Sequence, residues 1–181
     1  MWLAPARAMP ALFLAFKKAA ENQLESIVSW CAGPMVHVDI ITDDQRLMFT
    51  SYMFERFSMN RPVGYTADTH VCLRLDVSQE AHDAAQAMLL RLVGKQIPYN
   101  YSDVFRLIMP SAAPPRDIIS EEQVETLFCS QAITLVLRHC LDEDHALHPV
   151  ILGLNSRATT PSMLYDAAAP FCQQTDVFFH I

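Results

Sequence analysis

Two residues far apart in the sequence carry side chains that can act together in covalent catalysis: His37 in VHVDI and Cys129 in FCSQ. A thiol attacks as its thiolate, so a nucleophilic cysteine needs a nearby base or a helix N-terminus. A histidine can take the thiol proton, provided that its other ring nitrogen has an orienting partner. The alternative interpretation is structural, because free cysteines are usually buried and a histidine in a strand is usually just hydrogen-bonded.

The sequence leaves open where the helix that carries Cys129 begins. Ser120-x-x-Gln123 resembles a capping box, and a helix starting there would hold Cys129 in its middle. Thr126 is a second possible N-cap, which would put Cys129 at the third helical position, among the unpaired amides of the first turn. Either start places the same residues on one apolar face: Cys129, Ile133, Val136 and Cys140.

The first half of the chain is predicted to consist mainly of strands, and His37 falls in the second of them. The expected strands are 11–16, 35–42, 46–52 and 71–77. A helix with apolar residues at 24, 27, 28 and 31 separates the first two strands and ends at Gly33-Pro34. Asp43-Asp44 is expected to form a turn, and 55–69 is expected to be irregular.

The second half is predicted to be mainly helical. Ser78 is a plausible N-cap for a helix that Gly94 ends, and Thr160-Pro161 opens another helix. The remaining expected segments are a loop entering a short helix at 99–105, a flexible loop at 110–115 and a last strand at 175–181. Strands followed by helices predict an α+β fold, and no composition shift divides residues 1–181, so we expect one domain.

Composition narrows the classes of partner. The 181 residues carry a formal charge of −7, which disfavours nucleic acid as the main partner. No apolar run is long enough for a transmembrane segment. The five cysteines are odd in number and contain no C-x-x-C pair, which is typical of a reducing compartment, so we expect a cytoplasmic or other intracellular protein.

Five short motifs follow one another in an order that is more specific than any of them alone. They are His37-Val38-Asp39, the strand 46–52, Tyr99-Asn100-Tyr101, Phe128-Cys129-Ser130-Gln131 and the helix start 161–165 (PSMLY). This order resembles the circularly permuted branch of the NlpC-like papain-fold cysteine hydrolases, a branch that includes the lecithin:retinol acyltransferase-like enzymes and also occurs in viruses. The resemblance extends over roughly residues 11 to 166.

The resemblance implies a permuted papain-like fold, in which an antiparallel sheet packs against a helix that carries the nucleophilic cysteine near its N-terminus. It further implies a thiol hydrolase of the amidase or peptidase type, with a thioester on Cys129 and His37 as general base. The third catalytic residue is open. Asp39 is favoured because it shares a strand face with His37, and Thr50 or Ser51 on the returning strand are the rivals.

The resemblance also implies an oxyanion site. The backbone amide of Cys129 would supply one hydrogen bond, and the hydroxyl of Tyr99 or Tyr101 a second. Gln131 is expected to face outward or to hold a loop. The expected substrate is a peptide or a small acyl-containing molecule, and neither a cofactor nor a metal is expected.

Three alternatives accompany this hypothesis. The same fold could have lost turnover and serve as a binding module, or it could act on lipids as an acyltransferase or thioesterase. The third is a small zinc-stabilised domain built on Cys140, His145 and His148, a spacing that lacks a fourth ligand.

Overall fold

One antiparallel sheet organises the molecule. The computed structural model describes residues 9–18, 23–42, 47–52, 55–60, 64–109, 113 and 115–175. The strands are β1 (Ala11–Lys17), β2 (His37–Thr42), β3 (Met48–Thr50), β4 (Ser58–Asn60), β5 (His70–Asp76) and β6 (Gln173–Thr175). Their order across the sheet is β4-β3-β2-β1-β5-β6, and every neighbouring pair is antiparallel. The first strand of the sequence therefore lies in the interior of the sheet, between β2 and β5.

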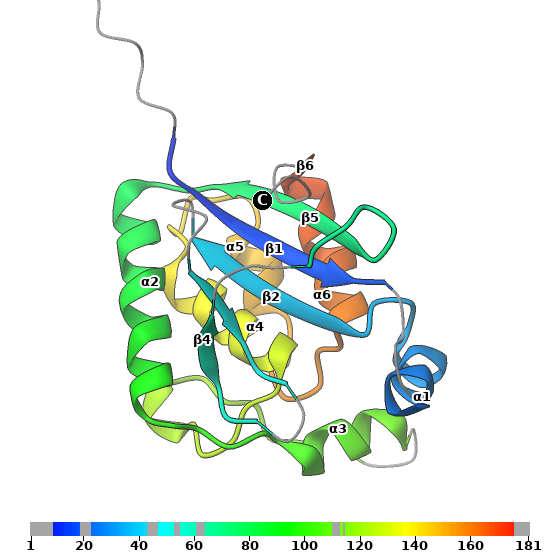
Figure 1. The fold of residues 1–181 in the computed structure, drawn as a ribbon. Coiled ribbons are helices and arrows are strands. Elements are labelled where there is room, and N and C mark those ends of the chain that lie inside the picture. Colours follow the sequence, from blue (N-terminus) through cyan, green and yellow to red (C-terminus); the bar gives the residue numbers. More distant parts are fainter. Residues whose placement is uncertain are drawn as a thin grey trace, which may run out of the picture.

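The helices cover one face and one end of this sheet. They are α1 (Gln23–Ala32), α2 (Gln79–Gly94), α3 (Tyr101–Ile108), α4 (Cys129–Cys140), α5 (His148–Leu152) and α6 (Pro161–Ala168), with short 3₁₀ turns η1 (Glu121–Gln123) and η2 (Ala169–Phe171). Figure 1 shows α4, α5 and α6 behind the sheet and α2 along its left side, while α1 and α3 lie together beyond its lower end. The expected α+β class with an antiparallel sheet is confirmed.

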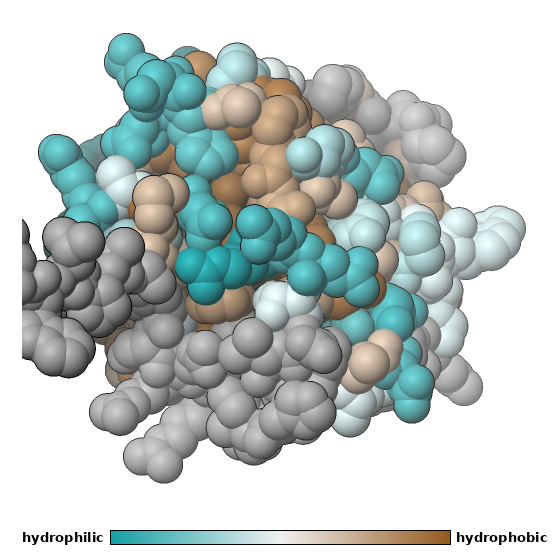
Figure 2. Space-filling model, turned by 90° about the horizontal axis from the view of Figure 1, so that it is seen from above, coloured by the Kyte–Doolittle hydropathy of each residue, from teal (hydrophilic) through white to brown (hydrophobic). Residues whose placement is uncertain are grey.

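The larger apolar core lies between the sheet and the helices. Alternate residues of β1 and β2, such as Leu14 and Val38, pack there with Leu89 of α2 and Val136 of α4. Every residue of α4 except His139 is buried, which makes this helix the centre of the core. A smaller cluster lies on the other face of the sheet: Ala11, Phe13, Ala15, Ile41, Met48, Tyr65 and Cys72. Seen from above in Figure 2, hydrophilic side chains cover much of the described surface and apolar residues show between them.

The loop before β2 is fixed by the start of α6. Gly33 has a φ of 100°, a left-handed conformation that favours glycine. A Cβ at Gly33 would lie 2.5 Å from Ser162 Oγ, so a side chain has no room there. The same Ser162 hydroxyl accepts a hydrogen bond from the backbone N–H of Met35 (2.9 Å). These contacts fix the backbone just before His37, the first residue of β2.

The helix with Cys129 begins at neither of the predicted sites. Ser120 precedes only the 3₁₀ turn η1, and Thr126 lies outside any helix. The helix α4 starts at Cys129 itself, and Phe128 is the N-cap residue. Gln131 Oε1 accepts a hydrogen bond from the Phe128 N–H (3.3 Å), so a side chain from the first turn of α4 pairs with the backbone amide of the N-cap residue.

Other predictions meet different outcomes. The strands β1, β2 and β5 and the helices α2 and α6 lie where they were expected, and Ser78 and Thr160 cap those two helices as predicted. The segment 55–69 is not wholly irregular, because β4 pairs there with β3. Asp43-Asp44, most of the 110–115 loop and residues 176–181 of the expected last strand lie outside the described residues. Within the described part of the chain, no helix is long and apolar enough to span a bilayer.

Candidate active site

A small pocket brings His37 and Cys129 together at the end of the sheet. It has a volume of about 50 Å³, and it opens between α1, α3 and the N-terminus of α4. Its walls come from segments distant in the sequence: Glu25, Ala32, Val36, His37, Tyr52, Tyr99, Val104, Leu107, Phe128, Cys129 and Pro161. Most of these side chains are apolar or aromatic, so the thiol and the imidazole share a pocket with a mainly apolar lining.

Cys129 is the first residue of α4 and is 5% exposed. The backbone N–H groups of a first helical turn have no intrahelical acceptor, and they carry the positive end of the helix dipole. The thiol therefore lies where a negative charge is stabilised. The core packing of α4 behind it fixes this position, because Ala132 and Ile133 are fully buried against the sheet.

His37 is held by two partners on one ring nitrogen. Its Nε2 lies 2.8 Å from Asp39 Oδ1 and 3.0 Å from Thr50 Oγ1. Asp39 comes from the same strand face, and Thr50 comes from the returning strand β3. With Nε2 engaged in this way, Nδ1 is the ring nitrogen left to exchange a proton with Cys129, which lines the same pocket as His37.

Charges in the site favour a protonated His37 beside an ionised Asp39. Burial alone would lower the pKa of His37, but the Asp39 carboxylate and then Cys129 outweigh it and raise that pKa to about 10. Burial likewise opposes ionisation of Asp39. The charge of His37 and hydrogen bonds from His37, Thr50 and Tyr65 still hold the pKa of Asp39 below its usual range. The pair is therefore an imidazolium and a carboxylate at neutral pH.

Two tyrosines complete the surroundings of this pair, and sequence reasoning missed both. The ring of Tyr52 stacks on that of His37, with centroids 4.3 Å apart and planes 14° apart. The Tyr65 hydroxyl donates to Asp39 Oδ2 (2.8 Å), on the side away from the helices. Burial, and then the charge of Asp39, raise the pKa of each of these phenols, so both stay neutral donors. No local sequence pattern indicates that Tyr65 contacts Asp39, because the two residues are 26 positions apart and only the fold brings them together.

Of the two tyrosines considered for the oxyanion site, Tyr99 lines the pocket and Tyr101 does not. Tyr101 is 36% exposed and packs edge-on against the Tyr99 ring, with centroids 5.0 Å apart. Burial and then the proximity of Cys129 raise the pKa of Tyr99, which keeps its hydroxyl protonated. Ser51 does not contact His37 in any described hydrogen bond, and it donates instead to the Leu127 carbonyl (3.1 Å).

Gln131 lies fully inside the protein and does not face outward. Its Oε1 accepts from the Phe128 N–H and from Asn100 Nδ2 (3.2 Å). It therefore ties the start of α4 to the residue that follows Tyr99, which is the loop-holding alternative of the two expectations.

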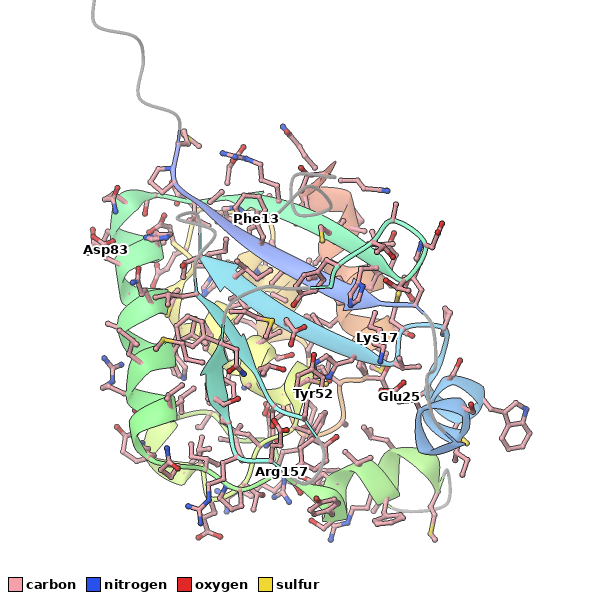
Figure 3. All side chains as sticks on the ribbon, in the orientation of Figure 1. Phe13, Lys17, Glu25, Tyr52, Asp83 and Arg157 are labelled. Atoms are coloured by element: carbon pink, nitrogen blue, oxygen red, sulfur yellow. The ribbon has the colours of Figure 1, made fainter. Side chains whose placement is uncertain are left out.

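Glu25 lines the pocket and forms an ion pair with Lys17, which does not line it. Lys17 Nζ lies 3.1 and 3.2 Å from the two carboxylate oxygens of Glu25, and both side chains are largely buried. Figure 3 shows the two facing each other near the end of β1, with Tyr52 close by. Sequence reasoning did not include Glu25, although it lines the same pocket as Cys129.

Among the described residues, no group of three or more histidine, cysteine or acidic side chains is arranged to hold a metal ion. Cys140 is buried at the end of α4, and His145 Nδ1 accepts a hydrogen bond from the Leu147 N–H (3.1 Å). The zinc alternative thus lacks a set of converging ligands. All five cysteines are free thiols.

Comparison with known proteins identifies no relative of this chain. The chain matches no protein-family model, no curated protein sequence and no solved structure.

Proposed function

We propose that the protein is a thiol hydrolase of the amidase or peptidase type, with Cys129 as nucleophile and His37 as acid and base. The observation that carries this proposal is that His37 shares a pocket with Cys129, while its Nε2 is held by Asp39 and Thr50. Nucleophilic catalysis needs a thiol, an imidazole that can take its proton and an acid that orients the imidazole. Here these groups are buried, and the thiol lies at a helix N-terminus. A permuted papain-like fold, to which the order of the motifs points, is part of the same proposal.

In the first step the sulfur of Cys129 attacks the carbonyl carbon of an amide or ester. The thiol proton rests on His37, where the Asp39 carboxylate stabilises the imidazolium. As the tetrahedral intermediate collapses, the bond from carbon to the leaving nitrogen or oxygen breaks, and His37 donates its proton to the leaving group. The products are an amine or alcohol and a thioester on Cys129.

In the second step water attacks the thioester carbonyl. His37, now neutral, takes one proton from this water, and the carbon–sulfur bond breaks. The carboxylic acid leaves and the Cys129 thiol is restored, so the protons balance over the cycle. The stack of Tyr52 on His37 holds the ring in place through both steps.

The negative oxygen of both intermediates needs hydrogen-bond donors. The backbone N–H of Cys129 has no intrahelical acceptor, since Cys129 is the first residue of α4. The Tyr99 hydroxyl is the second donor, because this phenol shares the pocket with Cys129 and stays protonated. One such donor contributes about 3 kcal/mol to acyl transfer.

Trapping of the acyl-enzyme tests the proposal. The protein is mixed with p-nitrophenyl acetate, quenched in acid and analysed by intact-mass and peptide mass spectrometry. We expect one acetyl group on Cys129, none on that peptide in Cys129→Ala, and acylation slowed by about 10² to 10⁴ in His37→Gln. Cys31→Ala is the matched control, since Cys31 is half-buried and outside the pocket. An acetyl group spread over several cysteines, or acylation indifferent to His37, would exclude a catalytic thiol at Cys129.

A further inference from the structure

A second buried carboxylate, Asp103, belongs to α3, the helix whose Val104 and Leu107 line the pocket, but Asp103 does not line it. Its side chain is fully buried, yet it is surrounded by donors. Arg157 approaches with both arms of its guanidinium: Nε lies 2.6 Å from Oδ2 and Nη2 lies 2.9 Å from Oδ1. Arg106 Nη1 adds a contact of 3.2 Å. Two-pronged pairs of this kind fix position as well as charge.

The partner Arg157 comes from the loop between α5 and α6, 54 residues further along the chain. Figure 3 shows it below the sheet, beside the start of α3. The hydrogen bond to Asp103 raises the pKa of Arg157. Removing a charge from water is costly unless it is paired well, so this pair requires a fixed geometry of the two segments that carry it.

Asn100 connects this pair to the pocket. Its Nδ2 lies 2.7 Å from Asp103 Oδ2 and 3.2 Å from Gln131 Oε1, and its Oδ1 caps α3 by accepting from the Asp103 N–H (3.1 Å). Its backbone N–H donates to the Leu127 carbonyl (2.9 Å). The residue that follows Tyr99 is thus bonded both to Asp103 and to the segment that leads into Cys129.

We propose that Asp103 and Arg157 are positioning residues that hold the Tyr99 hydroxyl at the oxyanion site. They act through Asn100, and neither touches the reacting atoms. The chain of contacts runs from Arg157 to Asp103, to Asn100, and from there both to Tyr99 along the backbone and to Gln131 at the start of α4. This inference rests on the proposed function, because it assigns a role within the same reaction.

The physical reason is that an oxyanion donor works only when it is already in place as charge develops. A displacement of about 1 Å in a group that positions the reaction can cost about 10²-fold in rate. Tyr99 lies outside the helices and strands, and its ring packs edge-on against the exposed Tyr101. The hydrogen bonds of Asn100 and the isolated bridge between Tyr99 and Leu127 are what fix this loop against α4.

The test is a double-mutant comparison of the acylation rate of Cys129 by p-nitrophenyl acetate. Asp103→Asn keeps the shape of the side chain and removes its charge. We expect it to lower the maximal acylation rate by about 10-fold or more in the wild-type background, with little change in the half-saturating concentration. In the Tyr99→Phe background the same substitution should cost less than about 2-fold further, because the hydroxyl that it positions is gone.

Two controls separate positioning from general damage. Glu121→Gln is the matched control, since Glu121 also accepts from two cations, Arg91 and Lys95, but lies outside the pocket. We expect it to leave the acylation rate unchanged. Arg157→Lys keeps the charge and loses the two-pronged contact, so it should lower the acylation rate less than Asp103→Asn does. It replaces Asp103→Asn in the test if that variant folds poorly.

The outcomes distinguish the positioning role of Asp103 from the nucleophilic role of Cys129. An equal loss from Asp103→Asn with and without the Tyr99 hydroxyl would overturn the positioning role while leaving the nucleophile intact. Alkylation of Cys129 by iodoacetamide, which forms no oxyanion, should be unaffected by Asp103→Asn. If the wild-type protein is not acylated at Cys129 at all, the proposed function fails and this inference fails with it.

Discussion

At the scale of single residues, the site depends on which side chains surround His37. Asp39 and Thr50 share its Nε2, and Tyr65 holds the second oxygen of Asp39. Of the three residues predicted as possible partners, Asp39 and Thr50 both hydrogen-bond to the ring, while the hydroxyl of Ser51 donates to the Leu127 carbonyl. Their roles in a reaction remain predictions, and each can be tested separately.

Asp39→Asn should impair the reaction far more than Thr50→Val. The amide keeps the shape of the carboxylate but cannot stabilise the imidazolium, so we expect acylation of Cys129 to fall by about 10²-fold or more. Thr50→Val removes a neutral hydrogen bond and should cost about 10-fold or less. Single-turnover acylation kinetics measure both. A larger loss in Thr50→Val than in Asp39→Asn would make Thr50 the principal partner of His37.

The raised pKa of His37 makes a prediction about stability. A group with a folded-state pKa of about 10 and an ordinary value of 6.5 stabilises the fold fully below pH 6.5, and this contribution is lost as the pH rises toward 10. The free energy of unfolding of the wild-type protein should therefore fall between pH 7 and pH 10 more steeply than that of His37→Gln. Urea unfolding followed by circular dichroism provides the values.

The comparison with His37→Gln is needed because other groups also titrate in this range. Burial raises the pKa of Cys72 to about 12 and of Cys140 to about 11, so ionisation of these thiols in the unfolded chain lowers stability at high pH in both proteins. Identical slopes in the two proteins would mean that His37 does not gain charge stabilisation in the fold.

At the scale of elements, the geometry of His37 depends on the loop that α6 holds. Gly33→Ala should destabilise the protein by about 2–3 kcal/mol, because the left-handed backbone costs about 1–2 kcal/mol and the new Cβ meets Ser162. Gly64→Ala is the matched control. Gly64 is also left-handed, with a φ of 78°, but nothing lies within 4 Å of the new Cβ.

Thermal and urea unfolding of the two variants separate these effects. We expect Gly64→Ala to show only the backbone cost and Gly33→Ala the larger loss. Equal destabilisation would indicate that the close approach of Ser162 to Gly33 does not constrain the loop before β2.

At the scale of the whole molecule, the sequence predicted the elements whose signals are local. The helix α2 has its cap, apolar stripe and terminal glycine within one segment, and β1 is a continuous apolar run. Asp39 was favoured as a partner of His37 on strand periodicity alone, which needs only residues two apart. The pairing of Cys129 with His37 was predicted from their residue types and from the order of the five motifs.

Features fixed by distant contacts were not predictable in the same way. The start of α4 depends on Gln131 and on backbone bonds between 98–100 and Leu127, which outweigh the cap signals at Ser120 and Thr126. The strand β4 is short and largely exposed, so it shows no alternation. The network of Asp103 and Arg157 joins residues 54 positions apart, and nothing local marks either one.

The most direct test of the central claim is alkylation of the native protein by iodoacetamide at pH 6, with the extent at each of the five cysteines read by mass spectrometry. An ordinary thiol, with a pKa of about 8.5, is almost wholly protonated at this pH. Cys31 and Cys172 are more exposed than Cys129, so access alone would favour them. We predict that Cys129 reacts at least about 10-fold faster than any other cysteine and that His37→Ala abolishes this advantage. Labelling led by Cys31, with Cys129 unreactive, would contradict an activated nucleophile and leave Cys129 as a buried structural thiol.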